Sequence, residues 1–203
     1  MKFRIFSLLL ACLPNAAHAH LVSARFGEFY NGFAHPLMTL NQLLPWLALG
    51  LLAGYQDVRR ARLSVVIFPL AVLIGALLSS IEALSTVAAL LNSISLVLCA
   101  LLVVLAFRLN FRLFCTLLIV FGLSHGIVNG EELLAGREKI LFLAGLTASA
   151  YIVITLVSAT SQAVTQRFTW GMIAVRALGS WMVAVGLIFI AFTATQPNLA
   201  VIG

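Results

Sequence analysis

The chain has 203 residues, of which 63% are hydrophobic and only 9% are charged. A soluble domain carries about 25% charged residues, so this composition excludes a water-soluble globular protein and predicts an all-α protein that lies in a lipid bilayer. The formal net charge of +6 fits arginines in cytoplasmic loops, where basic residues fix orientation. No basic patch is interleaved with aromatic residues, so nucleic acid is not expected as a partner.

The chain begins with a predicted secretory signal peptide at residues 1–19. Two basic residues precede an apolar run that is shorter than the ~20 residues a spanning helix needs, and an A-x-A cleavage site ends at Ala19. Cleavage there makes His20 the first residue of the mature chain. Residues 20–203 are then expected to form a single transmembrane helical domain. The alternative is a lipoprotein signal with an acylated Cys12.

Long apolar runs follow, and each is near the ~20 residues that a helix needs to cross a bilayer. We predict six spans, at about residues 36–54, 64–82, 86–107, 111–128, 140–160 and 170–194. The runs leave no room for a second domain.

The distribution of basic residues predicts the orientation of these spans. With the N-terminus outside the cytoplasm, basic residues are more frequent in the cytoplasmic loops than in the external segments, as the positive-inside rule expects. The cytoplasmic set is Arg59, Arg60, Arg62, Arg108, Arg112 and Arg167, and the external set is Arg25, Arg137 and Lys139.

Polar residues gather at the start of the first predicted span. Pro36 suits the first turn of a helix, so we expect His35 at its cap. Thr39 and Gln42 follow His35 at helical spacing and should share its face, whereas Asn41 lies about 100° away from Gln42. Because a polar stripe is costly in lipid, it usually faces a cavity or another helix. We therefore predict that these polar side chains line a channel.

A second polar segment ends the fourth predicted span. His125 and Asn129 are four residues apart, on one helical face, and Gly126 lets a neighbouring helix come close. Glu131 and Glu132 follow at the membrane surface. An imidazole, an amide and a carboxylate at this spacing can bind a divalent ion: imidazole suits nickel, copper and zinc, and oxygen ligands suit harder ions.

The two segments predict that the first and fourth spans are neighbours, with His35 and His125 facing one external cavity. The polar face of each segment must be buried against protein or water. The alternative is that each histidine hydrogen-bonds a backbone carbonyl or lies among the lipid headgroups.

These segments resemble the signature motifs of the HupE/UreJ family, small bacterial membrane proteins associated with nickel and cobalt uptake for hydrogenase and urease. The family carries Gly-Phe-x-His-Pro-x-x-Gly-x-Asp-His in the first span, and this chain has GFAHPLMTLNQ at residues 32–42. A later span carries His-Gly-x-x-His-Gly-x-Glu, and this chain has HGIVNGEE at residues 125–132. Neutral amides therefore stand at three ligand positions of the family: Asn41, Gln42 and Asn129.

The resemblance implies a permease of the bacterial inner membrane for a divalent transition-metal cation, nickel or cobalt, with its N-terminus in the periplasm. The candidate metal ligands that remain are His35, His125 and Glu131, with His20 at the mature N-terminus, whose amino group and imidazole also suit copper. Thr39, Asn41, Gln42, Asn129 and Glu132 are the candidate polar lining of the channel. Because three ligands are amides, the site is expected to be weakened.

Two other classes of function compete with a permease. The first is a non-transporting accessory protein, which docks as a helical subunit against a larger membrane complex or against a copy of itself. The replaced ligands, the small size and the short loops favour it. The second is an enzyme, but the sequence contains no nucleophile–base pair, nucleotide-binding loop or zincin motif, so we do not expect one.

Overall fold

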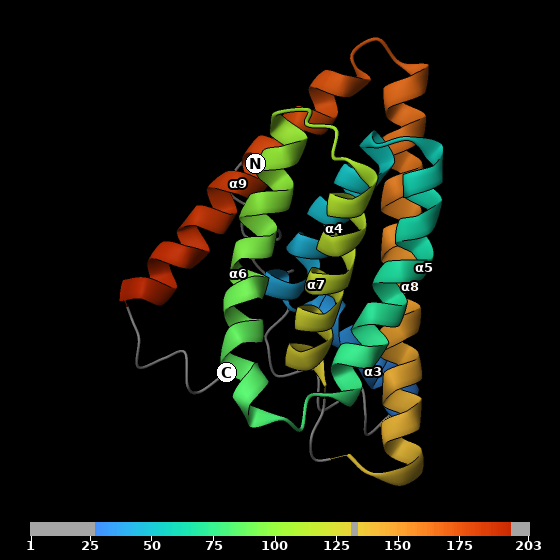
Figure 1. Ribbon diagram of the computed structural model, residues 1–203, viewed down its shortest axis with the longest axis vertical. Helices are drawn as coiled ribbons and strands as arrows, with labels where there is room; N and C mark the ends of the chain where they lie inside the picture. Colours follow the sequence, from blue (N-terminus) through green and yellow to red (C-terminus); the bar gives the residue numbers. More distant parts are fainter. Residues whose placement is uncertain (1–26, 131–133, 196–203) are drawn as a thin grey trace, which may run out of the picture.

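The computed structural model of the protein describes residues 27–130 and 134–195, and this part of the chain is helical throughout, with short turns. The predicted signal peptide, His20, Glu131 and Glu132 lie outside the described residues. The helices are α3 (Glu28–Met38), α4 (Leu40–Tyr55), α5 (Val58–Leu77), α6 (Glu82–Val104), α7 (Phe111–Asn129), α8 (Gly136–Arg167) and α9 (Gly171–Thr195) (Figure 1).

The helices from α5 to α9 are each long and apolar enough to cross a membrane. The pair α3 and α4 makes a sixth candidate span, broken by a bend of 78°. The all-α prediction with about six spans is therefore confirmed for the described residues, and the protein is a multi-pass membrane protein. Its exposed surface is rich in large apolar side chains, as expected of helices that face lipid.

The first span is not the continuous helix that the sequence predicted. α3 ends at Met38, Thr39 has an extended backbone, and α4 begins at Leu40. Pro36 lies inside the last turn of α3, where its missing N–H weakens the helix, and His35 lies within that turn rather than at a cap. The shared helical face of His35 and Gln42 was therefore a wrong prediction.

Tertiary packing explains where α3 lies. α3 crosses α8 at close range, because glycines face the neighbouring backbone on both sides of the contact. A Cβ atom at Gly32 of α3 would overlap the carbonyl oxygen of Phe142, and one at Gly145 of α8 would overlap that of Phe29. Close backbone approach through small residues is the usual way in which helices associate in lipid, and here it holds α3 across α8 instead of in line with α4.

Glycines also join α5 to α7. Added Cβ atoms at Gly75 of α5 and at Gly126 of α7 would overlap the carbonyl oxygens of Leu123 and Val72 respectively. The predicted close approach of a helix at Gly126 is thus confirmed. α7, which carries His125, is held against α5 with little freedom to shift.

Hydrogen bonds tie the α4–α5 turn to the α6–α7 connection at one end of the bundle. The hydroxyl of Tyr55 donates to the carbonyl oxygen of Ala106 at 2.6 Å. The side chain of Gln56 donates to the carbonyl oxygen of Phe107 at 3.1 Å and accepts from the N–H of Leu109 at 3.2 Å. These bonds fix α4 and α6 relative to each other, and both helices contribute to the site described below.

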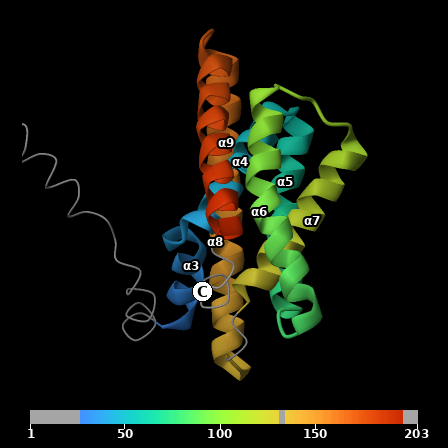
Figure 2. The ribbon, with the colours of Figure 1, turned by 90° about the vertical axis from the view of Figure 1, so that its left-hand side faces the viewer.

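The last helix lies along α6. Figure 2 shows α9 running beside α6 on one side of the bundle. Gly179 and Gly186 of α9 face Val103 and Val97 of α6, and the Nε of Arg176 donates to the carbonyl oxygen of Val104 at 2.7 Å. Most of the rest of α9 is exposed, so this helix borders the bundle and does not enclose the site.

Candidate functional site

His125 is buried at the meeting point of three helices. Its side chain on α7 is only 1% exposed. Its Nδ1 lies 3.0 Å from the Oε1 of Gln42 on α4, and its Nε2 lies 3.0 Å from the hydroxyl oxygen of Ser95 on α6. The ring is therefore held at both nitrogens by polar side chains from other helices.

Amides extend the site on both sides of the histidine. The Nδ2 of Asn129 donates to the Oε1 of Gln42 at 2.9 Å and to the carbonyl oxygen of His125 at 2.7 Å. The Oδ1 of Asn92 accepts from the hydroxyl of Ser124 at 2.9 Å. We call these buried residues the polar cluster: Gln42, Asn92, Ser95, Ser124, His125 and Asn129.

The hydrogen bonds assign the proton on the ring of His125. The bond from Asn129 Nδ2 to the carbonyl oxygen of His125 fixes which end of that amide is the donor, so the Oε1 of Gln42 is its acceptor. Nδ1 of His125 must then carry the hydrogen, because a carbonyl oxygen only accepts. In the neutral ring Nε2 is the acceptor. The hydroxyl oxygen of Ser95 lies 3.0 Å from Nε2 and 2.7 Å from the carbonyl oxygen of Asn92, so its one hydrogen serves either of these acceptors.

Aromatic side chains close the polar cluster against the bundle interior. The ring centroid of His125 lies 6.2 Å from that of Trp46 on α4 and 6.4 Å from that of Phe68 on α5. Trp46 and Phe68 themselves meet edge to face at 5.6 Å. The imidazole thus has polar groups along its edge and apolar rings around it.

Two buried polar atoms of this region have no hydrogen-bond partner among the described residues. They are the Oδ1 of Asn129, an acceptor, and the Nε1 of Trp46, a donor. Nearly all buried polar groups in proteins are hydrogen-bonded, and an unpaired one is costly in a medium of low dielectric constant. The Oδ1 of Asn129 therefore offers a contact to water, a polar solute or a cation, whereas the Nε1 of Trp46 offers one to water or a polar solute.

The polar cluster contains no carboxylate and no thiol. In the described part of the chain, no three or more histidine, cysteine or acidic side chains come close enough to share a metal ion. Among the described residues, a cation at His125 would therefore meet one imidazole and neutral oxygen atoms, which make a weak site for a transition metal.

The other candidate residues of the described part have different local surroundings. His35 is half-buried on α3, and its ring centroid lies 6.0 Å from that of Phe142 on α8. Thr39 is exposed at the bend between α3 and α4, where its hydroxyl donates to the carbonyl oxygen of His35 at 3.1 Å. Asn41 is exposed on α4. Of the candidates in the described part, Gln42, His125 and Asn129 come together, and a cavity shared by His35 and His125 stays a prediction.

The chain was compared with models of known protein families. The model described as HupE / UreJ protein matches residues 8–189. The chain belongs to the HupE/UreJ family. No curated protein and no solved structure matches it.

The HupE/UreJ motifs include three residues of the polar cluster. In the motifs quoted above, histidine stands at the positions of Gln42 and Asn129, and His125 is present in this chain. The structure brings these three motif positions into direct hydrogen-bond contact. Two segments that are far apart in the sequence therefore meet at one point of this HupE/UreJ protein.

Sequence reasoning missed the contribution of α6. Asn92 and Ser95 lie on the buried face of that helix, and their only signal is that they are polar residues inside a long apolar run. Polar residues within a span usually face the bundle interior and mark functional positions. The same signal, applied to residues 86–107, would have found them.

Proposed function

We propose that this protein is a permease of the bacterial inner membrane that carries a divalent transition-metal cation, nickel or cobalt, and that its N-terminus lies in the periplasm. The polar cluster around His125 is the place where the cation stops on its way through the bundle. Membership of the HupE/UreJ family supports a membrane protein of this type.

The observation that carries the proposal is the buried contact of His125 with Gln42 and Asn129. Ionisable side chains inside membrane helices are rare because their burial is costly, and they mark substrate and ion pathways. The aromatic rings of Trp46 and Phe68 pack around His125, so the polar cluster is a polar site within a largely apolar core.

The chemistry of the polar cluster fits weak, transient binding of the cation. Imidazole is a good ligand for nickel and cobalt, whereas amide oxygen is a poorer one. The unpaired Oδ1 of Asn129 is available to a cation next to His125. Transport requires a site that binds strongly enough for entry and weakly enough for release, so the amides favour passage over storage.

A non-transporting accessory protein is the second candidate. The observation that favours it is that Gln42 is hydrogen-bonded directly to both His125 and Asn129, so the polar cluster also joins α4 to α7. In that case the partner is a larger membrane complex or a copy of this chain, and the protein moves no cation.

Uptake of radioactive nickel into proteoliposomes separates the two functions. The decisive variant is the double substitution Gln42→His with Asn129→His, which puts imidazoles beside His125. Nickel should then bind at least about tenfold more tightly, since a restored ligand readily contributes 1.4 kcal/mol or more. The matched control is Ser93→His, which adds an imidazole at an exposed position of α6 and should leave binding unchanged. Asn41→Asp restores the carboxylate of the family motif at an exposed position and tests whether the cation site extends beyond the polar cluster.

The parent protein should take up nickel, and His125→Ala should abolish that uptake while the helical content in detergent stays the same. If neither the parent nor the double variant takes up or binds nickel or cobalt, the permease is ruled out and the accessory role becomes the better conclusion. If Asn41→Asp alone tightens binding, the cation site lies outside the polar cluster.

A further inference from the structure

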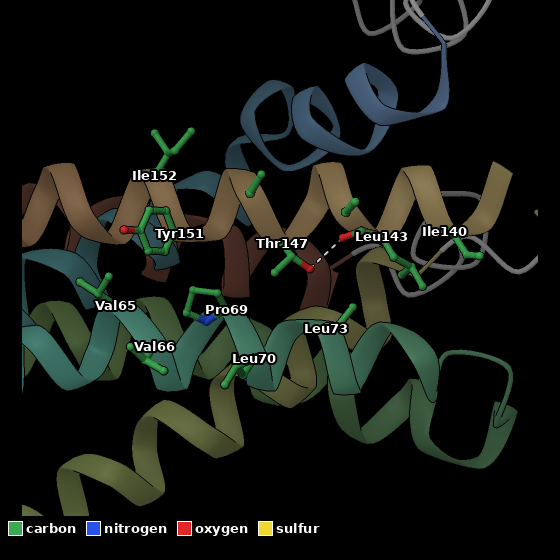
Figure 3. A pocket seen from close by; sticks show the side chains of 12 residues that line it. Val65, Val66, Pro69, Leu70, Leu73, Ile140, Leu143, Thr147, Tyr151 and Ile152 are labelled. Atoms are coloured by element: carbon green, nitrogen blue, oxygen red, sulfur yellow. Dashed lines mark hydrogen bonds between the residues drawn. The ribbon is translucent and has the colours of Figure 1, made fainter. Parts of the chain in front are cut away.

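An open apolar groove lies between α5 and α8. Its volume is about 820 Å³. Figure 3 shows Pro69 and Leu73 of α5 facing Leu143 and Thr147 of α8 across it. The full lining is Val65, Val66, Pro69, Leu70, Leu73, Ile140, Leu143, Ala144, Thr147, Ala148, Tyr151 and Ile152. A cavity of this volume is in the range of small-molecule binding pockets.

The shape of the groove follows from its side chains. Ala144 and Ala148 on α8 leave space opposite Pro69 on α5, while large side chains stand at the edges. Ile140, 67% exposed, is one of these edge residues, and Leu70 is another. From Ile140 to Ile152 the groove follows α8 for about 18 Å at 1.5 Å per residue. That length is close to one leaflet of a hydrocarbon core about 30 Å thick.

A positive charge lies at the end of the groove where α8 begins. Arg137 precedes Ile140 by three residues and Ala144 by seven, so it is on the groove face of the helix. Its side chain is exposed, and no hydrogen bond or ion pair joins it to another described residue. Glu138 and Lys139, one and two positions further on, point to other sides of α8.

The same end of α8 exposes backbone donors. The helix begins after Ala135, and no side chain caps its first turn. The first N–H groups of a helix have no partner within it and attract phosphate. The apolar groove, the side chain of Arg137 and the uncapped first turn of α8 therefore follow one another along the same face of this helix.

We propose that this groove binds a phospholipid with an anionic headgroup. One acyl chain lies between α5 and α8, and the phosphate contacts Arg137 and the first turn of α8. Basic side chains beside pockets between membrane helices bind anionic lipid headgroups, and Arg137 is the basic side chain on the groove face of α8. Phe68, whose ring centroid lies 6.4 Å from that of His125, precedes the groove residue Pro69 in the sequence, so α5 carries residues of both the groove and the wall of the polar cluster.

The test uses the full-length protein in proteoliposomes that contain phosphatidylglycerol with a photoactivatable group at the end of one acyl chain. The label should concentrate on peptides from α5 and α8, and unlabelled phosphatidylglycerol should compete better than phosphatidylcholine. Ala148→Phe fills the groove and should remove most of the label. The control Ala89→Phe makes the same change at an exposed position on α6 and should leave the label in place.

The headgroup contact is tested separately by Arg137→Gln, which should weaken competition by phosphatidylglycerol by about fivefold, as expected for one basic residue at a membrane surface. Lys139→Gln removes the same charge from another side of α8 and should change the competition by phosphatidylglycerol much less. Equal labelling of α9, equal competition by both lipids, or no effect of Ala148→Phe would overturn the proposal. A disulfide between two chains carrying Ala148→Cys would assign the groove to a second copy and also overturn it.

Discussion

The segments around His125 and His35 look alike in the sequence, but the structure gives them different surroundings. His125 is buried among polar side chains from α4, α6 and α7. His35 is half-buried on α3, a short helix that packs across α8. Both segments place a histidine beside a small or cyclic residue and near an amide. The difference shows that a motif histidine acquires a role from the helices that meet around it.

The two regions should differ most in how much stability is lost when a glycine that holds each of them is replaced. Gly126→Val should destabilise the protein by about 3 kcal/mol, at the upper end of the effect of overpacking, because a Cβ there overlaps the backbone of α5. Unfolding in a sodium dodecyl sulfate titration, followed by circular dichroism, measures this. Gly145→Val should cost less, since α3 can move away from α8 while the rest of the bundle stays intact. Equal losses for both variants would show that α3 is as firmly held as α5.

Removal of the two imidazoles should also have unequal effects. His125→Ala leaves a cavity beside Trp46 and takes a partner from both Gln42 and Ser95, so we expect a loss of about 2–3 kcal/mol. The same titration gives the value. His125→Gln, which keeps a polar side chain of similar length, should recover part of the loss. A loss no larger than that of His35→Ala would contradict the central role of His125.

Neighbouring amides on α4 offer a matched test. Gln42→Leu removes the acceptor for His125 and Asn129 and should destabilise the protein by about 1–2 kcal/mol, the cost of buried partners left unpaired. Asn41→Leu also replaces an amide by an apolar side chain, at the preceding residue, which is exposed. It should change stability by less than about 0.5 kcal/mol. If the two variants are equally stable, the hydrogen bonds of Gln42 contribute little to the fold.

The smallest effect is expected at the other histidine. His35→Ala should lower stability by less than about 1 kcal/mol, because the side chain is only half-buried and α3 is held mainly by its glycine contacts with α8. Nickel uptake by this variant is the informative measurement. Uptake close to that of the parent would confine the cation site to the polar cluster, whereas its loss would bring His35 into the pathway.

The apolar runs were enough to predict an all-α membrane protein with about six spans, because a bilayer demands long apolar helices whatever the details of packing. The orientation inferred from the basic loops stays a prediction. The motifs around Gln42 and His125 also indicated the family. The ends of α8 were not predictable from hydropathy, since its first and last turns are polar and extend the helix to Gly136 and Arg167.

The sequence by itself thus determined the approximate apolar spans and the residue types available to a site, because hydrophobicity acts locally along the chain. Only the tertiary structure decided which of those residues meet. The glycine contacts between α3 and α8 break the first span at Thr39 and direct His35 toward Phe142. The packing of α4 and α6 against α7 brings Gln42 and Ser95 to His125. Contacts between residues so distant in sequence depend on how whole helix surfaces fit together, and no local pattern records that fit.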